Sequence, residues 1–158
     1  MQLLILLFFY LIATPFHIIT FTTSESRIEL PDWQSSFNGI IEITFKSTIS
    51  SGTLLKNIGK TGDFLELLVR PTAVSLHYDL GQGSGNVTLT VNSAINTRFN
   101  DDQWHRARLF FSPSRVSLRV DSLTEVGRNF QQLHQVARLD IDGPLFVGFN
   151  PQRLDHNC

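Results

Sequence analysis

Residues 104–121, with the sequence WHRARLFFSPSRVSLRVD, decide the fold class of this chain. Arginines and other residues alternate with one set of side chains, namely His105, Ala107, Leu109 and Phe111. The alternation resumes over residues 115–120 with Val116, Leu118 and Val120. Side chains of a strand point in turn to opposite faces, so a period of two indicates strands. The Ser-Pro-Ser segment at 112–114 is typical of a turn. The stretch predicts an antiparallel hairpin with one face in a core.

The same hairpin gathers positive charge on its outer face. A turn over residues 112–115 places Arg108 opposite Arg119 and Arg106 opposite Asp121. Like charges directly across a ladder are destabilising, which calls for an explanation. One hypothesis is that Arg106, Arg108 and Arg119 grip an anionic partner such as a sulfated glycan. The alternative is that the side chains splay into solvent, where salt screens them within roughly 10 Å.

Other segments outside this hairpin show the same alternation, separated by Gly, Asn, Asp, Ser and Pro. Each predicts a strand whose apolar set faces inward. Roughly ten such strands at close spacing predict an all-β, two-sheet antiparallel β-sandwich. The four clearest sets are Ile41, Ile43 and Phe45; Leu65, Leu67 and Val69; Val74, Leu76 and Tyr78; and Val87, Leu89 and Val91.

Length and charge limit the functional classes. A chain of 158 residues with 42% hydrophobic content suffices for one domain with a substantial core. The 13 Lys and Arg residues against 14 Asp and Glu give a net charge of −1, so no global field attracts nucleic acid or an anionic membrane. We therefore expect no nucleic-acid partner, and any electrostatic recognition is local.

The N-terminus predicts export. An uncharged apolar run at residues 3–13 precedes polar residues at 20–26, as in a secretory signal peptide, so we assign residues 1–26 to a leader and 27–158 to the domain. The alternative is a membrane anchor over residues 3–21, which approaches the roughly 20 residues of a spanning helix. Export also fits the N-glycosylation sequon at Asn86. Cys158 is the single cysteine, and an odd thiol in an exported chain predicts a free or intermolecular thiol.

Five motifs, in this order and spacing, resemble the laminin G-like (LNS) domains of neurexins, contactin-associated proteins and laminin α chains. The motif at 99–105 resembles the family's Asn-Asp-x-x-Trp-His turn, and the last motif resembles its closing strand. The motifs are the strand pair GIIEITFK at 39–46 with SGTLL at 51–55, GDFLEL at 62–67, VSL at 74–76 through DLGQG at 79–83, FNDDQWH at 99–105 and LDIDGPLFVG at 139–148.

The resemblance implies a curved, concanavalin-like jelly-roll sandwich whose loop rim binds proteins or glycans, often beside a calcium ion. Carried onto this chain, it implies a weak Ca²⁺ site with the ligands Asp63, Leu80, Arg138 and Asp140, the second and third through their carbonyl groups. Carboxylate and carbonyl oxygens suit this hard cation. It also implies that C-terminal strands are missing and that Cys158 corresponds to the first cysteine of the family's pair. We expect such a domain to be marginally stable or to dimerise through its open sheet edge.

Glutamate, tryptophan and aspartate residues are candidates for other roles. Glu42 and Glu66 are the candidate carboxylates of a sandwich-fold glycosidase, but solvated strand positions explain them better, and we expect no enzyme. Trp104 is interpreted as a buried anchor of its turn, in preference to a ligand-contacting aromatic residue. Asp101 and Asp102 are predicted to hold that turn through side-chain bonds to the backbone.

These observations predict a secreted or cell-surface module for adhesion or receptor recognition, which binds a protein or glycan through its loop rim. The alternative is a truncated, soluble decoy or partial product with little activity. A membrane contact is expected only if the N-terminal segment is retained, and a dimer only through the open sheet edge or Cys158.

Overall fold

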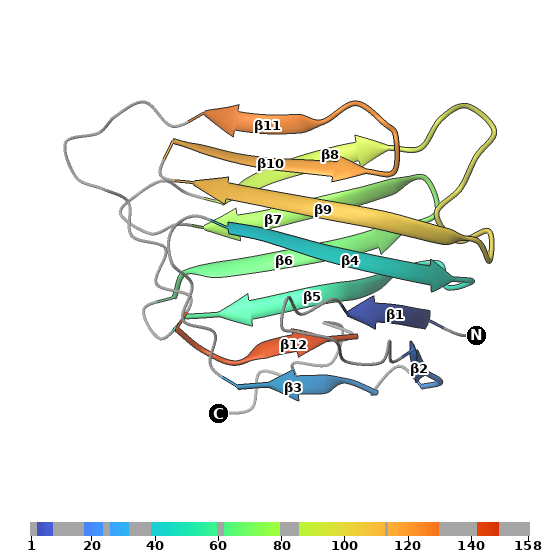
Figure 1. Ribbon diagram of the computed structural model, residues 1–158, viewed down its shortest axis with the longest axis horizontal. Helices are drawn as coiled ribbons and strands as arrows, with labels where there is room; N and C mark the ends of the chain where they lie inside the picture. Colours follow the sequence, from blue (N-terminus) through green and yellow to red (C-terminus); the bar gives the residue numbers. More distant parts are fainter. Residues whose placement is uncertain are drawn as a thin grey trace, which may run out of the picture.

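The computed structural model describes residues 3–7, 18–23, 26–31, 39–59, 62–79, 86–112, 114–129 and 142–148. These residues form two six-stranded sheets, whose neighbouring strands pair antiparallel, and no helix. Figure 1 shows the sheets stacked face to face. The predicted all-β sandwich is therefore confirmed. The described part of the chain holds no helix of the length and apolar character needed to cross a membrane.

The two sheets have simple strand orders. The first sheet contains, in spatial order, β11 (Val126–Asn129), β10 (Arg115–Val120), β9 (Trp104–Ser112), β4 (Gly39–Ser47), β1 (Leu3–Leu7) and β2 (Ile18–Phe21). The second contains β3 (Ile28–Leu30), β12 (Leu145–Val147), β5 (Gly52–Ile58), β6 (Phe64–Arg70), β7 (Ala73–Asp79) and β8 (Val87–Asn92).

The core lies between the sheets and is built by the alternating apolar sets. All the predicted inward residues of β6, β7 and β8 are buried, as are Ile43 and Phe45 on β4, while Ile41 is partly buried against them. The apolar positions of the β9–β10 hairpin complete the facing layer, from Ala107 to Val120. Burial of these side chains on both inner faces is the main stabilising contribution to the fold, at about 25 cal/mol per Å² of apolar surface.

The hairpin has the register that its turn predicts. Arg108 pairs with Arg119. Two residues further along each strand, the Asp121 N–H donates to the Arg106 carbonyl, with 2.8 Å between the nitrogen and the oxygen. Ser112 stabilises the turn, because its hydroxyl accepts a hydrogen bond from the Arg115 N–H at 3.1 Å. The sequence prediction that these arginines share one outer face is confirmed.

The N-terminal apolar run contributes to the first sheet. Strand β1 pairs with β4 from Leu3 opposite Ser47 to Leu7 opposite Ile43, and β2 pairs with β1. Phe21 is 5% exposed and packs against Gly148, where an added Cβ would lie 2.4 Å from the Phe21 ring. Gly148 also has a φ of +76°, so this contact requires glycine. The assignment of residues 1–26 to a leader stays a prediction.

Candidate binding face

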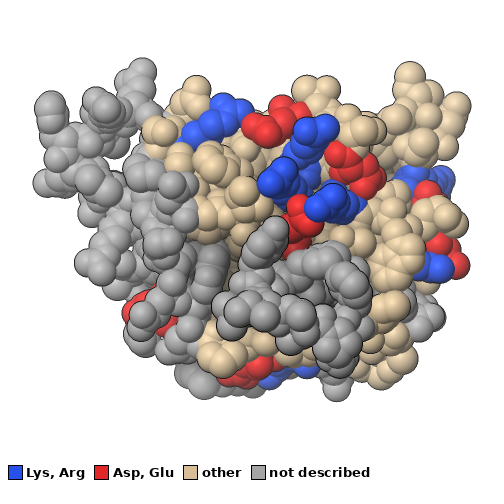
Figure 2. Space-filling model, in the orientation of Figure 1, with Lys and Arg blue, Asp and Glu red and all other residues tan. Residues whose placement is uncertain are grey.

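The outer face of the first sheet carries an array of polar and charged side chains on β4, β9 and β10. Figure 2 shows a compact group of basic side chains with acidic ones beside it. Backbone pairing fixes the array, because these side chains occupy the outward positions of paired strands. The pairs are Glu42 with Arg108, Thr44 with Arg106, Lys46 with Trp104, and Arg108 with Arg119. We call the set Glu42, Lys46, Trp104, Arg106, Arg108 and Arg119 the outer array.

Glu42 holds two of the three arginines. Its Oε1 accepts a hydrogen bond from Arg106 Nη2, and its Oε2 lies 3.9 Å from Arg108 Nε. The Glu42 side chain is 19% exposed, whereas those of Arg106 and Arg108 are 62% and 56% exposed. One carboxylate thus orients two guanidinium groups while most of their surface still faces solvent.

Arg119 supplies charge that no carboxylate neutralises by direct contact. It is exposed, and among the described residues it has no hydrogen-bond or ion-pair partner. Glu125 lies at the margin of the face, where a hydrogen bond from Arg115 Nη2 at 2.9 Å is the main cause of its lowered pKa. Among Glu42 and the three arginines alone, positive charges exceed negative ones by two.

Trp104 also belongs to this face, and its predicted role as a buried anchor is wrong. The side chain is 45% exposed. Trp104 has the same strand parity as Arg106 and Arg108, so it points outward, and the buried ring of this turn is instead Phe99, at 2% exposure. The alternation along residues 104–112 places Trp104 among the outward residues, whereas its turn motif alone suggested burial.

His105 clamps the turn that leads into β9. Its Nε2 lies 3.0 Å from Asp101 Oδ1, and its Nδ1 lies 2.9 Å from Asp121 Oδ2. The ring also packs edge-on against Phe99, with centroids 5.2 Å apart, and contacts Phe45. The clamp fixes the start of β9, where Trp104 and Arg106 project outward.

The neighbouring aspartates have separate tasks. Slight burial acts to raise the pKa of Asp101, but hydrogen bonds from His105 and from the Gln103 N–H outweigh it and lower that pKa. The prediction that Asp101 holds the turn is confirmed by the Gln103 bond at 2.9 Å. Asp102 has no such side-chain bond to the backbone. It adopts a φ of +62° and pairs with Lys46 Nζ at 3.3 Å.

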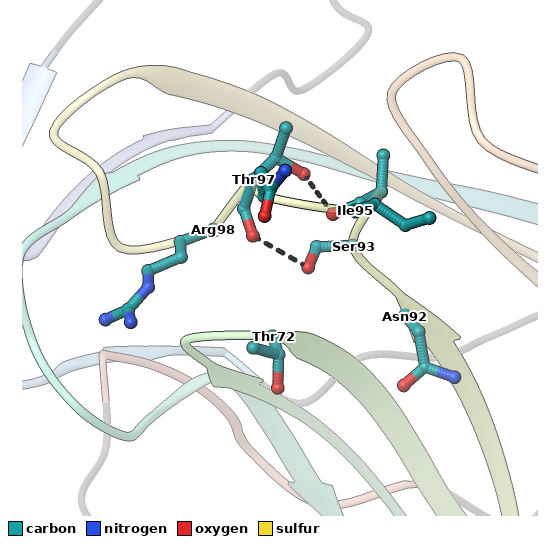
Figure 3. Close-up of a pocket in the computed structure, with 8 residues that line it drawn as sticks. Thr72, Asn92, Ser93, Ile95, Thr97 and Arg98 are labelled. Atoms are coloured by element: carbon teal, nitrogen blue, oxygen red, sulfur yellow. Dashed lines mark hydrogen bonds between the residues drawn. The ribbon is translucent and has the colours of Figure 1, made fainter.

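A separate depression of about 550 Å³ lies at the end of the sandwich, between Thr72 and the loop from Asn92 to Arg98. Figure 3 shows that the hydroxyl groups of Ser93 and Thr97 are engaged within the loop. Ser93 Oγ donates to the Thr97 carbonyl, and Thr97 Oγ1 donates to the Ala94 carbonyl, each at 2.9 Å. Arg98 is the only charged side chain among the lining residues, so this depression offers less to a ligand than the outer array.

The remaining predicted site residues are not brought together by the described part of the structure. Asp63 is 6% exposed just before β6, but Leu80, Arg138 and Asp140 lie outside the described residues, as does Cys158. Within the described ranges, no three His, Cys, Asp or Glu residues are grouped for a metal. The calcium site therefore stays a prediction.

The two candidate glycosidase carboxylates lie on different sheets. Glu42 faces outward from the first sheet, and Glu66 faces outward from the second, where it lies 3.4 Å from Lys56 Nζ. The core separates them, so they cannot flank one glycosidic bond as a retaining or inverting pair must. Asn86, the predicted glycosylation site, is exposed just before β8.

The sequence model of the laminin G domain matches residues 45–157, which is most of the chain. The chain belongs to the laminin G domain family. Domains LG4-5 of the mouse laminin α1 chain share its fold with a TM-score of 0.66 and 18% identity, over 85% of this chain and 35% of that one. The LG1-3 region of the laminin α2 chain gives a TM-score of 0.55 and 19% identity, over 77% of this chain and 25% of that one.

This chain thus spans about a third of the laminin α1 fragment and a quarter of the laminin α2 fragment. The catalytic domain of an endo-1,3-β-glucanase from Thermotoga petrophila also shares the fold, with a TM-score of 0.56 and 13% identity over 94% of this chain and 67% of that one. At such identities the likeness shows only the common sandwich. Laminin G domains are non-enzymatic modules that generally bind protein or glycan ligands outside the cell.

Proposed function

We propose that this laminin G domain is an extracellular recognition module that binds an anionic partner, a sulfated glycan, on its outer array. The observation that carries the proposal is the pairing of Arg108 with Arg119 across the β9–β10 ladder. Two like charges at this spacing repel each other, and Glu42, which pairs with Arg106 and Arg108, leaves Arg119 without a carboxylate in direct contact among the described residues. A sulfate group between them would turn this repulsion into two charge-assisted contacts.

The geometry favours an extended polyanion over a small ion. Arg106, Arg108 and Arg119 lie on two adjacent strands, about 4.8 Å apart, and successive outward positions on one strand are about 6.6 Å apart. The guanidinium groups therefore form a flat, open row without a closed pocket. The depth of a closed pocket favours small molecules, whereas a flat charged row suits a chain with repeated anionic groups.

Arg108→Ala and Arg119→Ala are each expected to weaken binding to immobilised heparin about tenfold at low salt, because each removes one charge-assisted contact. Each should also reduce the slope of log Kd against log salt by nearly one, since one fewer counterion is displaced. Surface plasmon resonance at several salt concentrations measures both quantities. Arg70→Ala, an exposed arginine on the second sheet, is the matched control and should change neither. Equal losses in all three variants would show nonspecific attraction and refute the site.

We further propose that recognition includes the calcium site that the family resemblance implies. Asp63 is buried at the end of the second sheet, and its carbonyl accepts a bond from the Gly59 N–H at 2.8 Å, which fixes the turn before β6. Together with Leu80, Arg138 and Asp140 it would supply hard oxygen ligands to Ca²⁺. The loop-rim docking of a protein partner belongs to this part of the proposal.

Calorimetric titration is expected to show calcium binding with a Kd on the order of 10⁻⁴ to 10⁻³ M, as is usual for extracellular modules with few charged ligands. The heat should disappear in Asp63→Ala and in Asp140→Ala, because each change removes a carboxylate. Asp79→Ala provides a nearby acidic control on β7. Undiminished heat in both ligand variants, or none in the wild type at millimolar calcium, would exclude the site.

Export is part of the same proposal. The apolar N-terminal run supports a leader at residues 1–26, and the exposure of Asn86 supports its glycosylation in a secretory pathway. Dimerisation through an open sheet edge or through Cys158, and a decoy role with little binding, stay as alternatives for the secreted form.

A further inference from the structure

From the outer array we infer that Trp104 is a stacking platform for a sugar ring, and that the ligand is a sulfated oligosaccharide laid along β9 from Trp104 to Arg108. This inference rests on the proposed function and extends it, because it adds a residue that contacts the sugar ring and not its sulfate groups. It begins from the position of Trp104, whose side chain is 45% exposed on the arginine-bearing face.

A half-exposed indole on a charged face leaves a large apolar surface in contact with water. The core does not explain its position, since the inward positions of the same strand are taken by Ala107, Leu109 and Phe111. A ligand that covers the ring would gain from removing this surface from water. The ligand must therefore present an apolar face close to its anionic groups.

The spacing of the array selects among anionic ligands. At about 3.3 Å per residue, the levels of Trp104 and Arg108 are separated by about 13 Å along β9, with Arg106 between them. A pyranose ring has a C–H face that stacks on an aromatic ring, and its sulfates project at the edges. A sulfated oligosaccharide combines both features over this length, whereas an acidic polypeptide offers charge without a stacking ring.

The platform is fixed before any ligand arrives. Trp104 lies opposite Lys46 in the β4–β9 ladder, and Lys46 is held by Asp102 at 3.3 Å. The next residue, His105, is clamped between Asp101 and Asp121. A side chain on a rigid strand loses little conformational freedom on binding, which favours recognition by a preformed surface.

The inference is tested by titrating the full protein with a size-defined, sulfated heparin oligosaccharide while tryptophan emission and Kd are measured at several salt concentrations. Trp104→Ala should raise Kd about five- to tenfold and leave the salt slope unchanged, because no charge contact is lost. Trp104→Tyr should recover most of the affinity. Arg108→Ala gives the complementary result, a reduced slope with the emission change retained.

Ile95→Ala is the matched control, since it removes an exposed apolar side chain (91% exposed) that is not a member of the outer array. If Trp104→Ala lowers the melting temperature, Trp104→Leu tests the same point, because it keeps apolar bulk but lacks the aromatic face. Wild-type affinity in these Trp104 variants, with binding still dependent on Arg108, would overturn the inference and leave the proposed function standing. Tight binding of polyglutamate that does not depend on Trp104 would also overturn it. Failure of the wild type to bind the oligosaccharide at all would remove both.

Discussion

Asn57→Ala is expected to lower the free energy of unfolding by about 2 to 3 kcal/mol. Asn57 is fully buried on β5, and its Nδ2 donates to the carbonyls of Gly143 at 2.8 Å and Pro144 at 3.2 Å. Both carbonyls lose their donor in the variant, and each buried group without a partner costs about 1 to 3 kcal/mol. Asn57 Oδ1 has no partner among the described atoms, and its removal offsets part of the loss.

The surroundings of Asn57 cannot adjust to its loss, because two backbone segments approach closely there. A Cβ added at Gly143 would lie 1.9 Å from the Ile58 carbonyl oxygen, so the segment entering β12 leaves no room to rearrange around a lost bond. Urea unfolding at neutral pH measures the effect. Asn57→Asp, similar in size but without the amide donor, should lose at least as much as alanine, whereas Asn92→Ala, at an exposed strand end, should change stability by less than about 0.5 kcal/mol. A loss below about 1 kcal/mol in both Asn57 variants would contradict the account.

His105→Ala is expected to cost about 2 to 3 kcal/mol of unfolding free energy at neutral pH. The change removes two hydrogen bonds to carboxylates, at 2.9 and 3.0 Å, together with ring contacts to Phe45 and Phe99. It leaves the carboxylates of Asp101 and Asp121 without their contacts to the imidazole ring. His77→Ala is the control, because that ring makes a single bond, to Thr88 on the outer face of the second sheet, and should cost less.

The acid dependence of stability tests the same clamp. The pKa of Asp101 is lowered in the folded state, so its stabilising contribution is present above its ordinary value near 4 and is lost as pH falls through the lowered value. The His105→Ala variant lacks the hydrogen bond that lowers this pKa, and its stability should therefore fall less between neutral pH and about pH 3 than that of the wild type. Urea unfolding at both pH values gives the comparison. Parallel losses in the two proteins would show that the clamp contributes nothing to the acid response.

Strand parity made much of this molecule predictable. The alternation along β4, β6, β7 and β8 placed their apolar side chains in the core, and the Ser-Pro-Ser turn fixed the register that pairs Arg108 with Arg119. Both follow from local rules, since a one-residue slip would move every apolar side chain to water. The same parity predicts an exposed Trp104, and only the resemblance of its motif to a structural turn suggested burial.

Other features depend on contacts that no local pattern contains. His105 contacts Asp121, which lies 16 positions later in the sequence, and Glu42 contacts Arg106, which lies 64 positions later. A sequence shows that such residues exist, but their meeting depends on which strand lies beside β9. The pairing of β4 with β9 is set by the packing of the whole sandwich rather than by either strand alone.

The segregation of the two faces of β9 bears on how such a domain can diversify. Its inward residues fill the core, whereas its outward residues, from Trp104 to Arg108, contribute little to packing. Substitutions at the outward positions can therefore accumulate one at a time at small thermodynamic cost, even when they reverse a charge. A descendant of this chain could exchange a polyanion for a basic partner within a few replacements, while the same core and the same ladder persist unchanged.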